Sequence, residues 1–100
     1  MEKPLSPMEK WMVRSNLTRL RAGESKMPEL VALLRHNGYP RIAAAVETSW
    51  AKERLEYLRG ELRAERVSYG DLDELQSLAA YIEPGDVELL EPAGVPEFPN

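Results

Sequence analysis

Apolar residues recur three and four positions apart along most of the chain, the spacing typical of helices that bury one side. The longest such segment covers residues 41–67, contains no proline and is rich in Ala, Leu, Glu and Arg. Its apolar side chains separate into two stripes on roughly opposite sides of the predicted helix. The first stripe is Ala44, Thr48, Ala51, Leu55, Leu58 and Leu62, and the second is Ile42, Val46, Trp50, Tyr57, Gly60 and Ala64. The two stripes predict a long central helix that is packed from both sides.

Gly60 is an unusual residue for the interior of this helix, because glycine there costs about 1 kcal/mol relative to alanine. It neighbours Ala64 on the second stripe. The pattern predicts either a close approach of another backbone at Gly60 or a kink or break of the helix.

Shorter helices are predicted on both sides of the central one, over residues 7–22, 25–37, 68–82 and 86–91. Ser6-Pro7-Met8-Glu9 and Ser68-Tyr69-Gly70-Asp71 are capping boxes that open two of them. The side chains expected to be buried are Met8, Trp11, Met12, Val13, Leu17 and Leu20, then Leu30, Leu33 and Leu34, then Leu72, Leu75, Ala79 and Ile82, and finally Val87 and Leu90.

No period-two pattern of strands occurs in the sequence. We therefore predict an all-α fold, a single small bundle of four to five helices around the central helix at about 41–67. Residues 1–100 are expected to form one domain with a proline-rich acidic tail at about 92–100, anchored by Val95 or Phe98.

Charge is distributed unevenly along the chain, whose net charge is −4. The first 70 residues hold 13 basic and nine acidic residues, a charge of +4, and the last 30 hold eight acids and no base, a charge of −8. Such asymmetry can steer a partner or hold two parts of one fold together.

Catalytic chemistry finds no support in the sequence. The only histidine, His36, lies at a predicted helix end, where an imidazole interacts with terminal carbonyls or solvent, and there is no cysteine. Phosphate-binding loops, nucleophile elbows and HExxH motifs are missing. We expect no enzyme activity, no catalytic, cofactor-binding or metal-binding residues, and no small-molecule substrate.

The cellular setting is predicted from the same features. The first residues contain no apolar run of signal-peptide length, and no segment is apolar enough for a membrane span. Together with the lack of cysteine, this predicts a cytoplasmic protein without a membrane partner.

Protein association through the central helix is the function that we expect. The first stripe also forms a short heptad seam in which two of three charge pairs between parallel copies are attractive. The alternative is that this stripe packs against helices of its own chain. The predicted interface, with the chain itself or a host protein as partner, consists of Trp50, Leu55, Tyr57, Leu58 and Leu62.

Nucleic-acid binding by the basic N-terminal part is the alternative function, as in a DNA-associated transcriptional regulator. The bases that could contact phosphates are Lys10, Arg14, Arg19, Arg21, Lys26, Arg35 and Arg41. Residues 41–47 offer few groups able to read base edges, which weakens this interpretation. A further alternative is an acidic inhibitor that mimics DNA through the C-terminal acids.

The run ERVSYGDLDELQSLAAYIEPGDVELLEPAGVPE, together with WAKERLEYLRGELRAE before it, resembles small uncharacterised proteins of actinobacterial phages and their hosts. The resemblance covers mainly residues 45–97 and includes no diagnostic motif. It implies an intracellular accessory protein of a phage or mobile element and assigns no functional residue.

Overall fold

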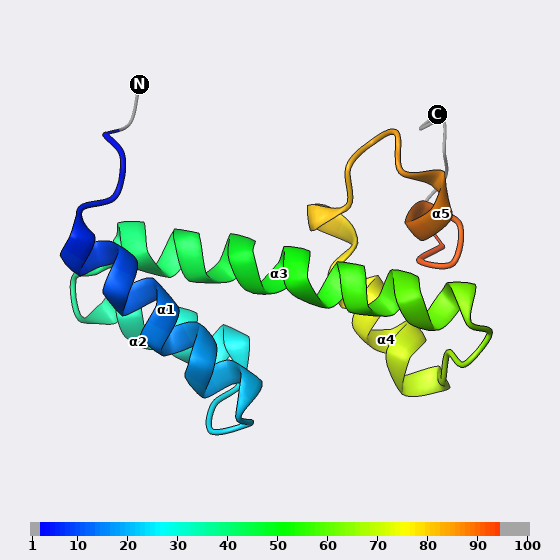
Figure 1. Cartoon of the computed structure of the whole chain (residues 1–100), viewed down its shortest axis with the longest axis horizontal. Coiled ribbons are helices and arrows are strands. Elements are labelled where there is room, and N and C mark those ends of the chain that lie inside the picture. The colour runs from blue at the N-terminus through cyan, green and yellow to red at the C-terminus, as the bar shows by residue number, and fades with distance from the viewer. Residues whose placement is uncertain (1–2, 95–100) are drawn as a thin grey trace. The chain divides into compact units, whose positions relative to one another are not determined.

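The computed structural model describes residues 3–94 of the chain, and every regular element in that range is a helix (Figure 1). In chain order the elements are α1 (Pro7–Arg21), α2 (Met27–His36), α3 (Pro40–Arg63), α4 (Tyr69–Ser77), the 3₁₀ turn η1 (Ala79–Tyr81) and α5 (Val87–Leu90). The predicted all-α class is confirmed over these residues. Val95 and Phe98, the expected anchors of the tail, lie outside the described residues.

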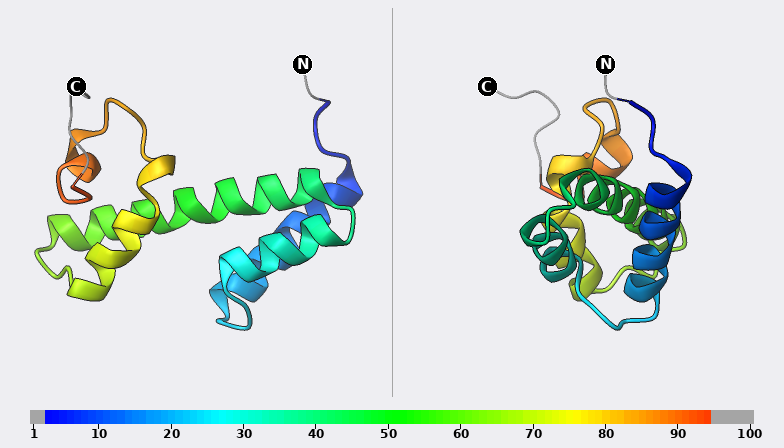
Figure 2. Two further views of the ribbon diagram at one scale, coloured as in Figure 1. Left: turned by 180° about the vertical axis from the view of Figure 1, so that it is seen from behind. Right: turned by 90° about the vertical axis from the view of Figure 1, so that its left-hand side faces the viewer.

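The chain forms two compact units, residues 1–50 and residues 51–100, and the boundary between them falls inside α3. In the first unit, α1 and α2 lie along the N-terminal half of α3 (Figures 1 and 2). Its core consists of Val13, Leu17, Leu20, Leu30, Val31, Leu34, Ile42, Ala43 and Val46. In the second unit, α4, η1 and α5 pack on the C-terminal half of α3 around Ala51, Leu55, Leu58, Leu75, Leu78, Ile82, Leu89, Leu90 and Ala93.

Both predicted capping boxes are present. In α1, Ser6 Oγ accepts a hydrogen bond from the Glu9 N–H at 3.2 Å, and Glu9 Oε1 accepts one from the Ser6 N–H at 3.0 Å. The same reciprocal pair joins Ser68 and Asp71 at the start of α4. Because each box satisfies two backbone groups that a helix start leaves unpaired, the local sequence fixes where these helices begin.

Two predictions about burial in the helices expected at 25–37 and 86–91 are wrong, and so is the predicted end of the helix expected at 68–82. Leu33 and Val87 are exposed, because the buried row of α2 is formed by Leu30, Val31 and Leu34, and because α5 turns Leu89 rather than Val87 inward. The helix expected to reach Ile82 is α-helical only to Ser77. The Leu78 N–H donates to the carbonyls of both Glu74 and Leu75, which tightens the chain into η1 and buries Leu78.

The central helix ends at Arg63, four residues before the predicted end at Val67. Glu65 adopts a left-handed conformation with φ of 57°. Its N–H donates to the Leu62 carbonyl and the Arg66 N–H donates to the Glu61 carbonyl, the two bonds of a Schellman motif. An ion pair between Arg66 Nη2 and Glu61 Oε1, at 3.1 Å, takes the place of the apolar contact that usually accompanies this motif. The sequence carries no glycine here, so the end of the helix could not be located from it.

Each unit covers one of the two predicted stripes of α3. In the first unit Ile42 and Val46 of the second stripe are buried, whereas Ala44 and Thr48 of the first stripe are exposed. In the second unit Ala51, Leu55 and Leu58 of the first stripe are buried and Leu62 is half-buried, whereas Tyr57, Gly60 and Ala64 of the second stripe are exposed. Both stripes are therefore packed, but each along only one half of the helix.

The expected backbone approach or break at Gly60 is wrong. The helix continues through this position, and a Cβ atom placed on Gly60 would have nothing within 4 Å. We therefore predict that Gly60→Ala raises the free energy of unfolding by about 1 kcal/mol, because alanine restricts the unfolded chain and favours helix without meeting a neighbour. Urea denaturation followed by circular dichroism measures this change.

Gly38 provides the matched control for that substitution. It lies just after α2 with φ of 85°, a conformation that a side chain strains, so Gly38→Ala should lower the free energy of unfolding by about 1 kcal/mol. A Gly60→Ala variant that is no more stable than the wild type would contradict the open geometry around Gly60.

Candidate functional site on α1

Two large apolar side chains on α1 are exposed, although both were predicted to be buried. Met8 is 67% exposed and Trp11 is 60% exposed. The buried row of the helix contains Val13, Leu17 and Leu20. Trp11 precedes Val13 by two residues, about 200° around a helix, so it points away from that row. This angle was available from the sequence and would have identified Trp11 as a surface residue.

Lys10 and Arg14 lie one turn apart on α1 and border a hollow in the first unit. The hollow has an apolar lining from Leu5, Val13 and Leu17, and Ser49 of α3 completes it. We call Met8, Lys10, Trp11 and Arg14 the α1 surface, and Leu5, Val13, Leu17 and Ser49 the α1 hollow.

A second hollow of the first unit adjoins the α1 hollow and shares Leu5 and Ser49 with it. Its other lining includes Ala44 and Thr48, the exposed part of the first stripe, and Arg41. The small side chains of Ala44 and Thr48 leave room for another element to approach α3 closely. The open face of the first unit thus continues from α1 to α3.

The side chains of Lys10 and Arg14 have no ion pair or hydrogen bond within residues 3–94. Most of the other bases in the nucleic-acid hypothesis differ in this respect. Carboxylates lie beside three of them, as the distances Arg19 Nε–Glu24 Oε2 of 3.9 Å, Arg35 Nη2–Glu47 Oε2 of 2.9 Å and Arg41 Nη1–Glu9 Oε1 of 3.5 Å show. Arg21 and Lys26 are exposed, and Lys26 is the residue before the first turn of α2.

The predicted interface on the central helix is largely occupied by the protein's own core. Leu55 and Leu58 are buried in the second unit, so the expectation that they form an open surface is wrong. Trp50 and Leu62 are half-buried against the cores of the first and second units, respectively. Tyr57 is exposed, with the guanidinium carbon of Arg54 4.4 Å from its ring centroid.

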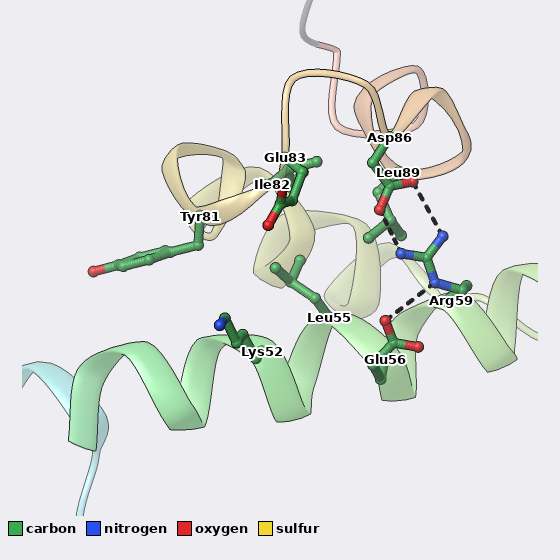
Figure 3. Close-up of a pocket in the computed structure, with 9 residues that line it drawn as sticks. All are labelled: Lys52, Leu55, Glu56, Arg59, Tyr81, Ile82, Glu83, Asp86 and Leu89. Atoms are coloured by element: carbon green, nitrogen blue, oxygen red, sulfur yellow. Dashed lines mark hydrogen bonds and ion pairs between the residues drawn. The ribbon is translucent and has the colours of Figure 1, made fainter. Parts of the chain in front are cut away.

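Opposite charges join α3 to the segment after η1 within the second unit. Arg59 of α3 donates to Asp86 and, through Nη1, to Glu88 Oε1 at 2.6 Å, while Arg63 Nε donates to Glu88 Oε2 at 2.8 Å. Figure 3 shows the Arg59–Asp86 contact at the edge of a hollow whose apolar side chains are Leu55, Ile82 and Leu89. The basic edge of α3 therefore binds the acidic segment that follows η1, within the same unit.

The acids of the C-terminal third are partly used by these internal contacts. Glu74 accepts two hydrogen bonds from Arg54, at 2.6 and 2.8 Å, and Asp71 caps α4. With Asp86 and Glu88, four of the eight acids have a role inside the second unit. This reduces the charge available to a mimic of DNA, which stays an untested alternative.

The arginine contacts predict that the second unit loses stability in acid. Hydrogen bonds from Arg63 and Arg59 lower the pKa of Glu88 from 4.5 to about 2, and Arg59 also lowers the pKa of Asp86. A carboxylate whose pKa is lower in the folded state stabilises the fold fully above its unfolded pKa, and the contribution is lost as pH falls through the folded value. We predict that the melting temperature falls between pH 5 and pH 2, and that Glu88→Gln makes this fall shallower. An equally steep fall of the melting temperature in the wild type and in Glu88→Gln would contradict a contribution of Glu88 to the acid sensitivity.

Groups suited to catalysis or metal binding are not brought together. His36 lies exposed in the last turn of α2. Within residues 3–94, no three His, Cys, Asp or Glu side chains are grouped so as to hold a metal ion. Over the same residues, no helix is long and apolar enough to cross a membrane.

Comparison with protein-family models found no match, and comparisons with curated proteins and with solved structures found none either. The resemblance to phage accessory proteins stays a prediction.

Proposed function

We propose that the chain is a protein-interaction module and that it binds its partner through the α1 surface. The observation that carries this proposal is the exposure of Trp11 and Met8, which lie three residues apart and are therefore neighbours on the surface of α1. Tryptophan buries a large area on contact and is enriched among residues that dominate binding energy. Methionine adapts to irregular apolar partners.

The site differs from the one that the periodicity of the central helix predicted. Leu55 and Leu58 are used by the core of the second unit, whereas Trp11 contributes little to the core of the first. Trp11 differs from a single exposed apolar residue because Met8 is exposed beside it on the same helix, and neighbouring exposed apolar side chains are typical of interaction sites.

Affinity capture from the native host extract tests this proposal with two variants. Met8→Ser combined with Trp11→Ala removes the apolar part of the α1 surface while leaving every buried residue in place. Tyr69→Ala is the matched control, because Tyr69 is an exposed aromatic residue of the second unit.

We expect quantitative mass spectrometry to find a protein captured by the wild type and by Tyr69→Ala that the double variant loses by tenfold or more. Thermal melts of all three proteins check that the fold is unchanged. A partner captured equally by the double variant would remove the α1 surface from the proposal.

A further inference from the structure

We infer that the partner element bound by the α1 surface is an acidic amphipathic helix of another protein. This inference rests on the proposed function and adds the chemistry of the partner to it. Three properties of the first unit carry it: unpaired positive charge, an adjoining apolar area and the spacing of the two bases.

The charge of the surface selects an acidic partner. Lys10 and Arg14 have no carboxylate beside them in the described part of the chain. The first 50 residues hold eight bases and five acids, so the unit as a whole carries +3. Carboxylates on a partner would form ion pairs with both bases. The net positive charge of the unit would also speed association with an acidic partner.

The apolar area selects a partner with an apolar face. Trp11 lies on one side of the two bases and the α1 hollow lies on the other. A ligand that satisfies Lys10 and Arg14 is therefore placed against apolar side chains as well. Burial of these side chains supplies the affinity, and the charge pairs supply the selectivity.

The spacing of the bases favours a helix. Lys10 and Arg14 are four residues apart, about 6 Å along the axis of α1. Carboxylates four residues apart on a helix lying nearly parallel or antiparallel to α1 have the same separation. Residues 3–94 contain no strand, so an extended peptide would find no sheet edge to join there. Recognition must then use side chains, as when a helix lies in a groove.

Nucleic acid fits the same surface less well. Arg19, Arg35 and Arg41 each have a carboxylate neighbour, and these carboxylates repel phosphate. Phosphate also gains nothing from Trp11 or the apolar side chains of the α1 hollow. We therefore treat duplex binding as an outcome that would overturn the inference.

A peptide-display selection on the full-length protein tests the partner's chemistry directly. The library presents 16-residue helices with a fixed apolar stripe of leucines, and each flanking position is varied among Glu, Gln and Lys. It is selected on the wild type, on Lys10→Glu/Arg14→Glu and on the Met8→Ser/Trp11→Ala variant. Fluorescence of the Trp50→Phe protein, in which Trp11 is the remaining tryptophan, then reports whether a selected peptide covers Trp11.

We expect Glu to be enriched at flanking positions four residues apart on the wild type and Lys on the charge-reversed variant. Exchange of Glu for Gln at both positions should weaken binding to the wild type by about tenfold. The matched peptide should shift the Trp11 emission to shorter wavelength.

Other outcomes separate the inference from the proposed function. Selection of neutral or basic flanks, with binding still lost in Met8→Ser/Trp11→Ala, would overturn the acidic partner and leave the proposed function standing. Enrichment that is identical on the wild type and on Met8→Ser/Trp11→Ala would overturn both. Salt-dependent binding of a 20-base-pair duplex that is lost in Lys10→Glu/Arg14→Glu would identify nucleic acid, and not an acidic helix, as the ligand of this surface. If sedimentation shows self-association and the same charge reversal abolishes it, the ligand of this surface would be a second copy of the chain.

Discussion

Leu58→Ala should lower the free energy of unfolding by about 3 kcal/mol. The side chain of Leu58 is 0% exposed and lies in the core of the second unit. Its truncation removes favourable transfer from water and leaves a cavity, because neighbours such as Leu75 and Leu89 relax only in part. Urea denaturation followed by circular dichroism at 222 nm measures the effect.

Leu33→Ala is the control for this substitution, because Leu33 is also a helical leucine but is exposed. We expect it to change the free energy of unfolding by less than about 0.5 kcal/mol. A loss of under 1 kcal/mol in Leu58→Ala would be incompatible with the packing of the second unit, and would reopen the proposal that this leucine belongs to an interface.

Arg59→Ala should lower the free energy of unfolding by about 2 kcal/mol. The side chain of Arg59 is only 17% exposed, and its removal leaves Asp86 without its arginine partner and Glu88 with Arg63 alone. Hydrogen bonds between charged groups that are largely shielded from water are stronger than those at the surface. Thermal melts and urea denaturation both register the loss.

Arg63→Ala tests whether shielding or merely charge is responsible. Arg63 binds Glu88 as well, but its side chain is 66% exposed, and solvent screens exposed ion pairs, so we expect a smaller loss of stability in Arg63→Ala than in Arg59→Ala. Similar losses of stability in Arg59→Ala and Arg63→Ala would contradict a larger contribution from the shielded arginine. Raising the salt concentration should reduce the contribution of Arg63 more than that of Arg59.

The sequence predicts the parts of the fold that depend on local chemistry. The helix starts at Ser6 and Ser68 follow from capping boxes, and the end of α2 follows from Asn37-Gly38. The end of α3 could not be predicted, because its Schellman motif uses Glu65 in a conformation that normally requires glycine. Backbone hydrogen bonds stabilise this turn without leaving a sequence signal.

The charge contacts of the second unit and the lack of a partner for Lys10 and Arg14 depend on packing that sequence periodicity does not contain. Arg59 and Asp86 are 27 positions apart, and only the packing of the second unit brings them together. Periodicity correctly showed two apolar stripes on α3 but could not say which half of each stripe is covered. The exposure of Trp11 could be predicted, because its angle of about 200° from Val13 on the helix places it opposite the buried row. Lys10 and Arg14 were among the predicted bases, but their lack of a carboxylate neighbour is visible only in the structure.

The position of the boundary between Trp50 and Ala51, in the middle of an unbroken helix, has a consequence for local opening. The helical hydrogen bonds near this point join residues of one unit to residues of the other. When the part of α3 in one unit unfolds, the adjoining turn of α3 in the other unit therefore loses hydrogen bonds as well. Native-state hydrogen exchange should therefore find the slowest amides of α3 beside the two cores and an intermediate class around residue 50. Loosening of either core should then speed hydrogen exchange of the amides around residue 50, where the helical hydrogen bonds of the two units meet.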